Sequence, residues 1–533
     1  MVSEEARPGA ERVRAAELVA ALSLATDLGS ELPLEHGLES TLFAMRLCER
    51  LGTDAETSSQ AYYACLLFHI GCTVDAEIVA EVFEPGALNR YLAPAMFGSR
   101  AEKTAAMMRA LPATGRFLPV RALQRASRLP MTVKGYRDHL VAVCEVGQML
   151  TDRLGLPPAV QLMFAAITER WDGKGMPGRA EGEAIPLAVR IVHVARDTAF
   201  HRMLGGDEFA ARVVHERGGR AFDPAIARRL AAEAPAILAL DAGTSGWDAV
   251  LACEPAPRLT LEGEAIDRAL AAMGDFADLA SPYLAGHAAG VAGLASAAAT
   301  RCRLAGTEPR AIRRAAHVHD LGRIAVPVAV WQKPGPLSAG EWEQVRLHAY
   351  HSERILCRSP FLAALAPTAT AHHERLDGSG YHRGAVGAAL SAPARLLAAA
   401  DAYHAMTEPR AHRTALPPAR AAAVLGEEAS MGRLDAEAVA AVIEAAGQQV
   451  PRIDLPAGLT DREAEVVGLL ARGLQTKQVA RALGISVKTA DRHVQNAYRK
   501  IGVSTRAAAT LFAMENGLVA WGELPIARAR RRA

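Results

Sequence analysis

The 533-residue sequence predicts an all-α protein built from several domains. Alanine and leucine are abundant, and both are strong helix formers, whereas aromatic residues make up only 5% of the chain. Half of the residues are hydrophobic, which is enough to bury a large core. The polar motifs described below lie in or beside runs with helical spacing of apolar residues. We therefore expect helices throughout, arranged as two similar domains followed by a smaller one.

Composition also narrows the functional classes. The net charge is +2 and the pI is near 8.2, so any surface that binds nucleic acid has to be local. Seven cysteines are scattered without a Cys-x-x-Cys pair, which is typical of a reducing compartment. Residues 1–11 lack a signal-peptide core, and no apolar run is long enough to span a bilayer. These features predict a cytoplasmic protein without membrane contact.

Two halves of the chain share one sequence frame. Residues 168–177 (TERWDGKGMP) align with residues 373–382 (HERLDGSGYH), and the match continues into the following helical run. Gly and Pro residues between the halves are typical of a linker. The predicted order is a flexible N-terminus over 1–14, a first domain over 15–240, a linker over 241–258 and a second domain over 259–447.

The second copy carries seven residues of metal-ligating type. Adjacent histidines on a helix point about 100° apart, so both serve one cluster only where the site wraps the helix end. That arrangement favours a two-metal centre, in which a carboxylate such as Asp320 can bridge two ions. Imidazole and carboxylate ligands suit two divalent transition-metal ions, iron or manganese. The candidate ligands are His287, His319, Asp320, His348, His372, His373 and Asp401.

The first copy has lost most of these ligands. His36 and His69 stand where His287 and His319 do, but the remaining positions carry Ile70, Val143, Ile167, Thr168 and Arg196. A site with isoleucine and arginine in place of carboxylates cannot hold two dications. We expect the first copy to lack a metal centre and to keep the Asp172-Gly173 turn for structural reasons.

The order His…His-Asp-x-Gly…His…His-His-Glu-x-x-Asp-Gly-x-Gly-Tyr…Ala-Asp, over residues 258–448, resembles the HD-GYP phosphodiesterases of the HD superfamily. The resemblance implies a helical HD-type fold, a centre of two or three metals and hydrolysis of cyclic di-GMP or a related cyclic dinucleotide. It makes the seven residues metal ligands and gives catalytic positions to Asp320 and Arg323. It places Tyr381, Arg410 and Arg413 near the nucleotide.

The sequence departs from the family pattern at four positions. Arg323 stands where the family usually has lysine, and arginine stays charged and cannot readily donate a proton. His382 follows Gly380-Tyr381, and His404 replaces a common aspartate. Tyr283 stands where three-metal members carry glutamate, which favours two metals here.

A Pro-containing linker over 448–457 leads to a third predicted domain over 458–520. Thr460 and Glu463 have the spacing of a capping box, and Gly473 ends the first helix. A short second helix is followed by a third over 487–501, capped by Ser486. The predicted buried stripe of this third helix is Val487, Ala490, Val494, Ala497 and Ile501.

This segment resembles the four-helix LuxR-type helix-turn-helix domain, which implies binding to palindromic DNA as a homodimer through a last helix over 507–516. Residues expected to face bases are Lys488, Thr489, Arg492, His493 and Gln495. Residues expected near phosphates are Thr476, Lys477, Arg499 and Lys500. A basic tail over 521–533 is expected to be solvated.

Three functions remain open from the sequence. The chain is a phosphodiesterase with a DNA-binding output, a sensor that binds the dinucleotide without hydrolysis, or a regulator whose helical domains are a scaffold only. The complete ligand set argues against the scaffold hypothesis. The departures at Arg323 and His382 argue against the enzyme hypothesis. Metal content distinguishes the scaffold from the other two, and turnover distinguishes enzyme from sensor.

Overall fold

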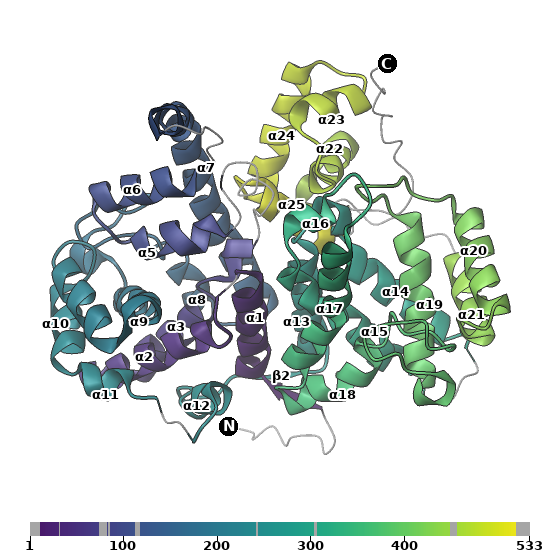
Figure 1. The fold of residues 1–533 in the computed structure, drawn as a ribbon, viewed down its shortest axis with the longest axis horizontal. Coiled ribbons are helices and arrows are strands. Elements are labelled where there is room, and N and C mark those ends of the chain that lie inside the picture. Colours follow the sequence, from purple (N-terminus) through teal and green to yellow (C-terminus); the bar gives the residue numbers. More distant parts are fainter. Residues whose placement is uncertain are drawn as a thin grey trace. The chain divides into compact units, whose positions relative to one another are not determined.

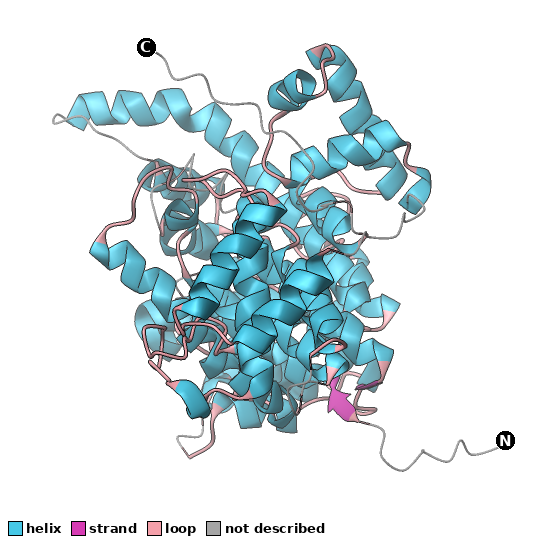
Figure 2. Ribbon diagram, turned by 90° about the vertical axis from the view of Figure 1, so that its right-hand side faces the viewer, coloured by secondary structure: helices cyan, strands magenta, loops and turns pink. Residues whose placement is uncertain are grey.

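The computed structural model describes residues 11–30, 32–73, 83, 86–111, 118–240, 243–302, 306, 308–447, 456–516 and 518. Helices dominate these residues (Figures 1 and 2), which confirms the predicted all-α class. Within them, only β1 (Arg12–Arg14) and β2 (Thr260–Glu262) are strands, and they pair antiparallel. Of the predicted flexible N-terminus (1–14), linker (448–457) and basic tail (521–533), residues 1–10, 448–455 and 521–533 lie outside the described residues. Residues Arg12–Arg14 of the predicted flexible segment form β1 and pair with β2. No described helix is long and apolar enough to cross a membrane.

The chain divides into two compact units, residues 1–269 and 270–533. In the first unit, α2, α3 and α9 pack together at the centre, and α10 closes on α9. Its principal helices are α1 (Ala15–Gly29), α2 (His36–Leu51), α3 (Ala55–Leu66), α6 (Arg100–Ala110), α7 (Leu118–Arg153), α8 (Pro158–Met163), α9 (Leu187–Arg217), α10 (Pro224–Ala232), α11 (Ala234–Leu238) and α12 (Gly246–Ala252).

Residues 243–258 of the segment predicted as a linker over 241–258 are packed within the first unit. This segment contains α12, whose Trp247 and Val250 are buried. Glu254 is also buried and accepts hydrogen bonds from the Arg14 guanidinium and from the Tyr63 hydroxyl at 2.9 Å. Apolar burial and a buried ion pair therefore fix this segment, although its Gly and Pro content is that of a linker.

The second unit begins within α13 (Glu264–Asp278) and has its core between α14, α15, α19 and α21. Buried alanine and leucine side chains let these helices approach closely. The elements that follow include α14 (His287–Ala299), α15 (Pro309–Val318), the 3-10 helix η5 (Leu321–Ala325), α16 (Val328–Trp331), α17 (Ala339–Leu356), α18 (Pro360–Ala369), α19 (Ala392–Thr407), α20 (Pro418–Ser430) and α21 (Ala436–Ala446).

The two units begin their central helices in the same way. Helix α2 starts at His36 after Glu35, and α14 starts at His287 after Gly286; both preceding residues have positive φ, 76° and 83°. In each unit an aspartate carboxylate from the preceding helix accepts the amide of the second helical residue. The shared entry places a histidine side chain at the centre of both units.

The Gly-rich turn is also built alike in both units. The Glu169 carboxylate accepts the amides of Gly178 and Arg179, and the Glu374 carboxylate accepts those of Arg383 and Ala385. At Gly380, an added Cβ would lie 2.5 Å from the Glu374 Cα, and Gly175 has the same restriction against Glu169. The glutamate and the second glycine of this motif therefore shape the turn in both units.

The C-terminal module has the four predicted helices, α22 (Asp461–Ala471), α23 (Thr476–Ala482), α24 (Val487–Ile501) and α25 (Arg506–Glu515). The capping box of Thr460 and the Ser486 cap are confirmed. Ala490, Val494 and Ala497 are buried as predicted. The prediction was wrong for Val487, which is 50% exposed, because the first residue of a helix lies beyond the last turn that packs on the core.

Candidate metal centre

The seven predicted ligands come from five separate segments and converge in the second unit. His287 opens α14, and His319 and Asp320 follow the end of α15. His348 lies within α17, His372 and His373 lie in the turn after α18, and Asp401 lies within α19. All are buried except the His373 side chain, which is 18% exposed. We call these seven residues the metal cluster.

Asp320 lies between two groups of imidazoles. Its Oδ2 is 2.8 Å from His319 Nε2 and 3.4 Å from His287 Nε2. Its Oδ1 is 3.2 Å from His348 Nε2 and 3.3 Å from His372 Nε2. The side chains that could share one ion accordingly form two sets. One set is His287, His319, Asp320 and Asp401, and the other is His348, His372 and His373. One carboxylate thus offers an oxygen to each of two adjacent groups of side chains that could hold a cation.

Hydrogen bonds fix the orientation of four imidazoles. His319, His348 and His372 each donate from Nδ1 to the carbonyl three residues earlier, at Ala316, Val345 and Ala369. His287 Nδ1 lies 2.8 Å from the Glu408 carboxylate. A proton held on Nδ1 leaves the lone pair on Nε2, which is the form that binds a metal.

Several polar atoms of the cluster are arranged for cations. The Nε2 atoms of His348 and His372 lie 3.1 Å apart, although both rings already donate from Nδ1. His319 Nε2 and both Asp320 oxygens are buried, and the neighbours of the two oxygens are imidazole and guanidinium nitrogens. Burial lowers the pKa of His372 to about 4, which keeps it a neutral ligand. Facing lone pairs and buried carboxylates fit two divalent transition metals.

Arg323 places a permanent positive charge beside the bridging carboxylate. Its Nη1 lies 2.6 Å from Asp320 Oδ2, and its guanidinium carbon lies 5.6 Å from the centre of the Trp331 ring. Burial alone would raise the pKa of Asp320, but Arg323 and His319 hold it well below its usual range. Asp320 is therefore ionised and able to bridge.

Glu408 is a member of the site that the sequence analysis missed. Its carboxylate contacts His287 Nδ1, and its other oxygen lies 3.1 Å from His404 Nδ1. Arg410 donates to it at 2.9 Å. His404 stands where the family commonly has an aspartate, and Glu408 lies four residues later, one helical turn away. An i, i+4 His-Glu pair was the sequence feature that could have indicated it.

The three predicted nucleotide residues have different surroundings. Tyr381 stacks on His373, with ring centres 4.6 Å apart, and so lies at the metal cluster. Arg410 donates to the Tyr283 carbonyl, and Arg413 donates to the carbonyls of Met406 and Glu408. Burial and the neighbouring Arg410 lower the pKa of Arg413. The two guanidinium groups thus place positive charge in the segment after α19, and their hydrogen bonds to backbone carbonyls also hold that segment in place.

The first unit holds an arginine where the second holds its metal cluster. Arg196, aligned with Asp401, is buried with its guanidinium 4.2 Å from the Phe200 ring centre and donates to the Ala93 carbonyl. Burial, together with Arg196, lowers the pKa of His36 to about 3. Among the described residues, the groups able to hold a metal all lie in the second unit.

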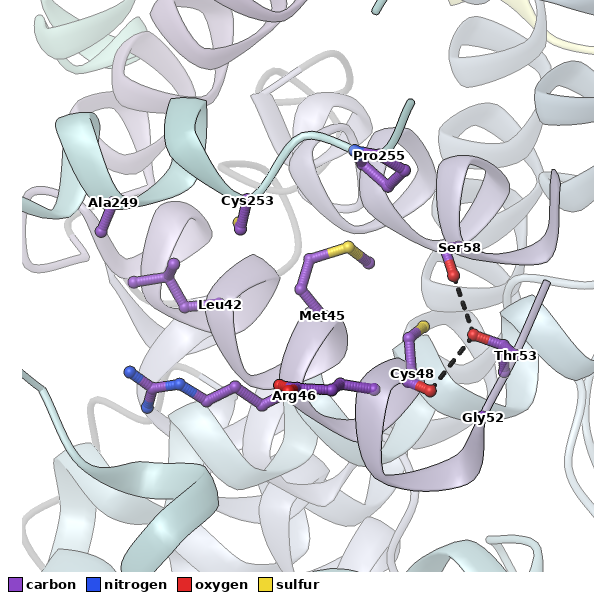
Figure 3. Close-up of a pocket in the computed structure, with 11 residues that line it drawn as sticks. Leu42, Met45, Arg46, Cys48, Gly52, Thr53, Ser58, Ala249, Cys253 and Pro255 are labelled. Atoms are coloured by element: carbon purple, nitrogen blue, oxygen red, sulfur yellow. Dashed lines mark hydrogen bonds between the residues drawn. The ribbon is translucent and has the colours of Figure 1, made fainter. Parts of the chain in front are cut away.

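The first unit does contain a pocket, shown in Figure 3. Residues of α2, the start of α3, α12 and the segment after α12 line it, including Met45, Cys48 and Cys253. The Thr53 hydroxyl lies 2.8 Å from that of Ser58 at its edge. None of the positions aligned with the metal ligands lines this pocket.

The predicted DNA-contacting residues are distributed over α23 and α24. Lys488, Arg492, Gln495 and Arg499 are exposed and repeat at three- and four-residue intervals along one face of α24. Thr489 and His493 are half-buried beside them, and Thr476 and Lys477 open α23. Lys500 contacts the protein itself, since its ammonium lies 2.6 Å from Glu463 and donates to the Gly458 carbonyl.

Comparison with known proteins shows which families this chain resembles. Residues 272–438 match the HD domain family, and residues 457–513 match the bacterial regulatory proteins of the luxR family. The 3'3'-cGAMP-specific phosphodiesterase 3 of Vibrio cholerae serotype O1 is 30% identical over 434 residues, which are 80% of this chain and 94% of that protein. This chain belongs to the HD-GYP phosphodiesterase family. The predicted resemblances to HD-GYP and LuxR-type proteins are confirmed.

Other relatives of the family match shorter parts. The cyclic di-GMP phosphodiesterase response regulator RpfG of Xanthomonas campestris pv. campestris is 39% identical over 127 residues, 24% of this chain and 33% of that protein. The crystal structure of a cyclic GMP-AMP-specific phosphodiesterase of V. cholerae has a TM-score of 0.56 at 24% identity. It covers 83% of this chain and 99% of that one, which supports the fold.

Proposed function

We propose that this chain hydrolyses a cyclic dinucleotide at the metal cluster and that the state of this site controls a DNA-binding output. The observation that carries the proposal is Asp320, which offers one oxygen to each of two imidazole groups. The relatives named for 3'3'-cGAMP and cyclic di-GMP support the substrate class. The ligand types favour two ions of iron or manganese.

When bound, two such ions supply Lewis acidity and hold the attacking and leaving oxygens of a phosphodiester in line. Asp320 keeps the two cation sites adjacent, and its ionised state needs no proton transfer before binding. Arg323 keeps its charge throughout, so it stabilises negative charge on the leaving oxygen and does not act as an acid. Arg410 and Arg413 suit the phosphates of the substrate.

The exposed basic face of α24 supports DNA binding by the C-terminal module. We expect it to act in the cytoplasm as a homodimer on a palindromic site, with α25 at the dimer contact. Turnover or occupancy of the metal cluster by the dinucleotide would then change operator affinity. A non-hydrolysing sensor is the second candidate, and Arg323 favours it because arginine cannot readily supply a proton to the leaving group.

The test is incubation of the metal-loaded full chain with cyclic di-GMP and with 3'3'-cGAMP in separate reactions. The enzyme releases linear product from at least one, and Asp320→Asn, folded by circular dichroism, releases none. If the wild-type chain binds a cyclic dinucleotide but releases no linear product, the chain is a sensor and not a phosphodiesterase. Operator affinity that is equal with and without nucleotide would show that the two activities are not coupled.

A further inference from the structure

One face of α17 carries aromatic and arginine side chains in alternation. Trp342, Arg346, Tyr350 and Arg354 follow one another at four-residue intervals, which places them on the same side of the helix. Trp342 is 47% exposed and Tyr350 is 40% exposed. Large aromatic surface left in water next to cationic side chains is typical of sites that bind nucleotides. We call these four residues the α17 stripe.

The α17 stripe adjoins the metal cluster through one tyrosine. Tyr381 stacks on the metal-cluster residue His373 and also makes a T-shaped contact with Trp342, with ring centres 6.4 Å apart. The Arg346 guanidinium carbon lies 5.5 Å from the centre of the same tyrosine ring. One ring therefore separates the exposed indole from a residue of the cluster.

The turn that carries Tyr381 is fastened to the same helix. His382 Nε2 lies 3.0 Å from the Glu353 carboxylate, which also accepts from Arg383. His382 stands at the position where the sequence departs from the family signature, and here it joins the turn to α17. These bonds hold Tyr381 in register with Trp342, so the aromatic surface is formed before any ligand binds.

We propose that the α17 stripe is a stacking surface for a nucleobase of the substrate, with Trp342 as the residue that contacts the base. The proposal rests on the proposed function, since it assumes a dinucleotide with a phosphodiester at the metal cluster. A base has a flat π-face that stacks on indole irrespective of its identity. Arg346 adds positive charge beside an anionic substrate.

The experiment measures KM and kcat for the cyclic dinucleotide that the full-length chain turns over. Trp342→Ala raises KM about 10-fold, the effect of losing one stacked base, and leaves kcat and metal content near wild type. Trp342→Phe recovers most of the loss. Leu347→Ala is the matched control, because Leu347 lies on the same helix at 43% exposure but outside the stripe.

A second measurement follows tryptophan fluorescence while nucleotide is added. The wild-type signal is quenched, and Trp342→Phe removes that quenching. Unchanged KM in Trp342→Ala, or quenching in Trp342→Phe as large as in the wild type, overturns the proposal for the stripe and leaves the proposed enzyme activity standing. Trp331 lies beside Arg323 and accounts for any smaller quenching that remains. Absence of both turnover and binding in the wild-type chain overturns the proposed function itself. A change of sedimenting mass in Trp342→Ala assigns the stripe to contact between two copies and also overturns the proposal.

Discussion

At the scale of single residues, the orientation of His287 differs from that of the other fixed imidazoles. His319, His348 and His372 are oriented by backbone carbonyls, which no substitution removes. His287 is oriented by a side chain, Glu408, which Arg410 and His404 hold in turn. Glu408 is therefore the position at which ligand orientation can be altered without touching a ligand.

We predict that Glu408→Gln weakens metal binding about 10-fold, within the range known for carboxylates that support a metal-bound histidine. The amide keeps the size of the side chain but removes the charge that favours a proton on His287 Nδ1. Competition with a chelator, followed by metal analysis, measures the change. Glu444→Gln is the control, since Glu444 forms an exposed ion pair with Arg301. Equal metal retention by both variants would contradict the role given to Glu408.

The sequence was sufficient to predict that the seven residues of the metal cluster come together, but it did not indicate Glu408 beside them. The ligands belong to motifs with fixed local spacing, such as His319-Asp320 and His372-His373, and the structure brings all of them together. Glu408 has no such motif, because its role comes from the way α19 ends against the start of α14. The contacts of Arg410 and Arg413 with backbone carbonyls likewise depend on tertiary packing.

At the scale of elements, the Gly-rich turn is a rigid part that positions Tyr381. The Tyr381 amide donates to the His373 carbonyl at 3.2 Å, and Leu376 donates to the Arg433 carbonyl. Gly380 packs against the backbone of Glu374 and Arg375, so its lack of a side chain is what permits this closure. From the sequence, this structural role was expected only for the copy of the turn in the first unit.

We predict that Gly380→Ala destabilises the second unit by about 1–3 kcal/mol, the usual effect of overpacking. The added methyl group meets backbone atoms, which cannot turn aside as a flexible side chain would. Denaturant unfolding measures the loss, and metal content falls with it because His373 shifts. Gly335→Ala provides the comparison, since nothing lies within 4 Å of its added Cβ. Similar stability of the two variants would show that the turn tolerates the change.

The first and third helices of the C-terminal module are joined by an ion pair between the buried Glu463 and the exposed Lys500. Lys500 lies 2.6 Å from Glu463 and, with the Thr460 amide, holds the pKa of Glu463 at about 2. A lowered carboxyl pKa in the folded state stabilises the fold above the unfolded pKa of about 4.3. That stabilisation disappears as the pH falls toward 2.

The predicted consequence is a pH-dependent effect of Glu463→Gln. The variant lowers the melting temperature of the module at pH 7, and the difference from wild type shrinks as the pH falls below about 4.3. Calorimetry of the full chain at a series of pH values measures the melting temperature of the module in the variant and in the wild type. A difference that stays constant from pH 7 to pH 3 would exclude the ion pair as its cause.

At the scale of the whole molecule, the chain combines two copies of one helical architecture that differ in the charge at their centres. Aspartates and histidines converge in the second copy, whereas Arg196 lies among Phe68, Phe97 and Phe200 in the first. A guanidinium supplies a covalently attached cation, and the aromatic rings stabilise it. The sequence predicted the loss of ligands, but the aromatic surroundings of Arg196 emerged only from the fold.

We predict that Arg196→Met lowers the stability of the first unit while the metal content of the full chain stays at the wild-type value. The substitution removes the hydrogen bond to Ala93 and the contacts with the aromatic rings, but it reaches no residue of the metal cluster. Thermal unfolding and metal analysis of the same sample measure both. A lower metal content in the Arg196→Met variant than in the wild type would show that the first unit takes part in metal binding.

The central claim is that Asp320 bridges two transition-metal ions in the second unit while the first unit holds none. A crystal of the full chain, with diffraction recorded at the absorption edge of the bound metal, tests it most directly. The account predicts two anomalous peaks about 3.5–4 Å apart on either side of the Asp320 carboxylate. A single peak there, or any peak beside His36 and His69, would contradict it.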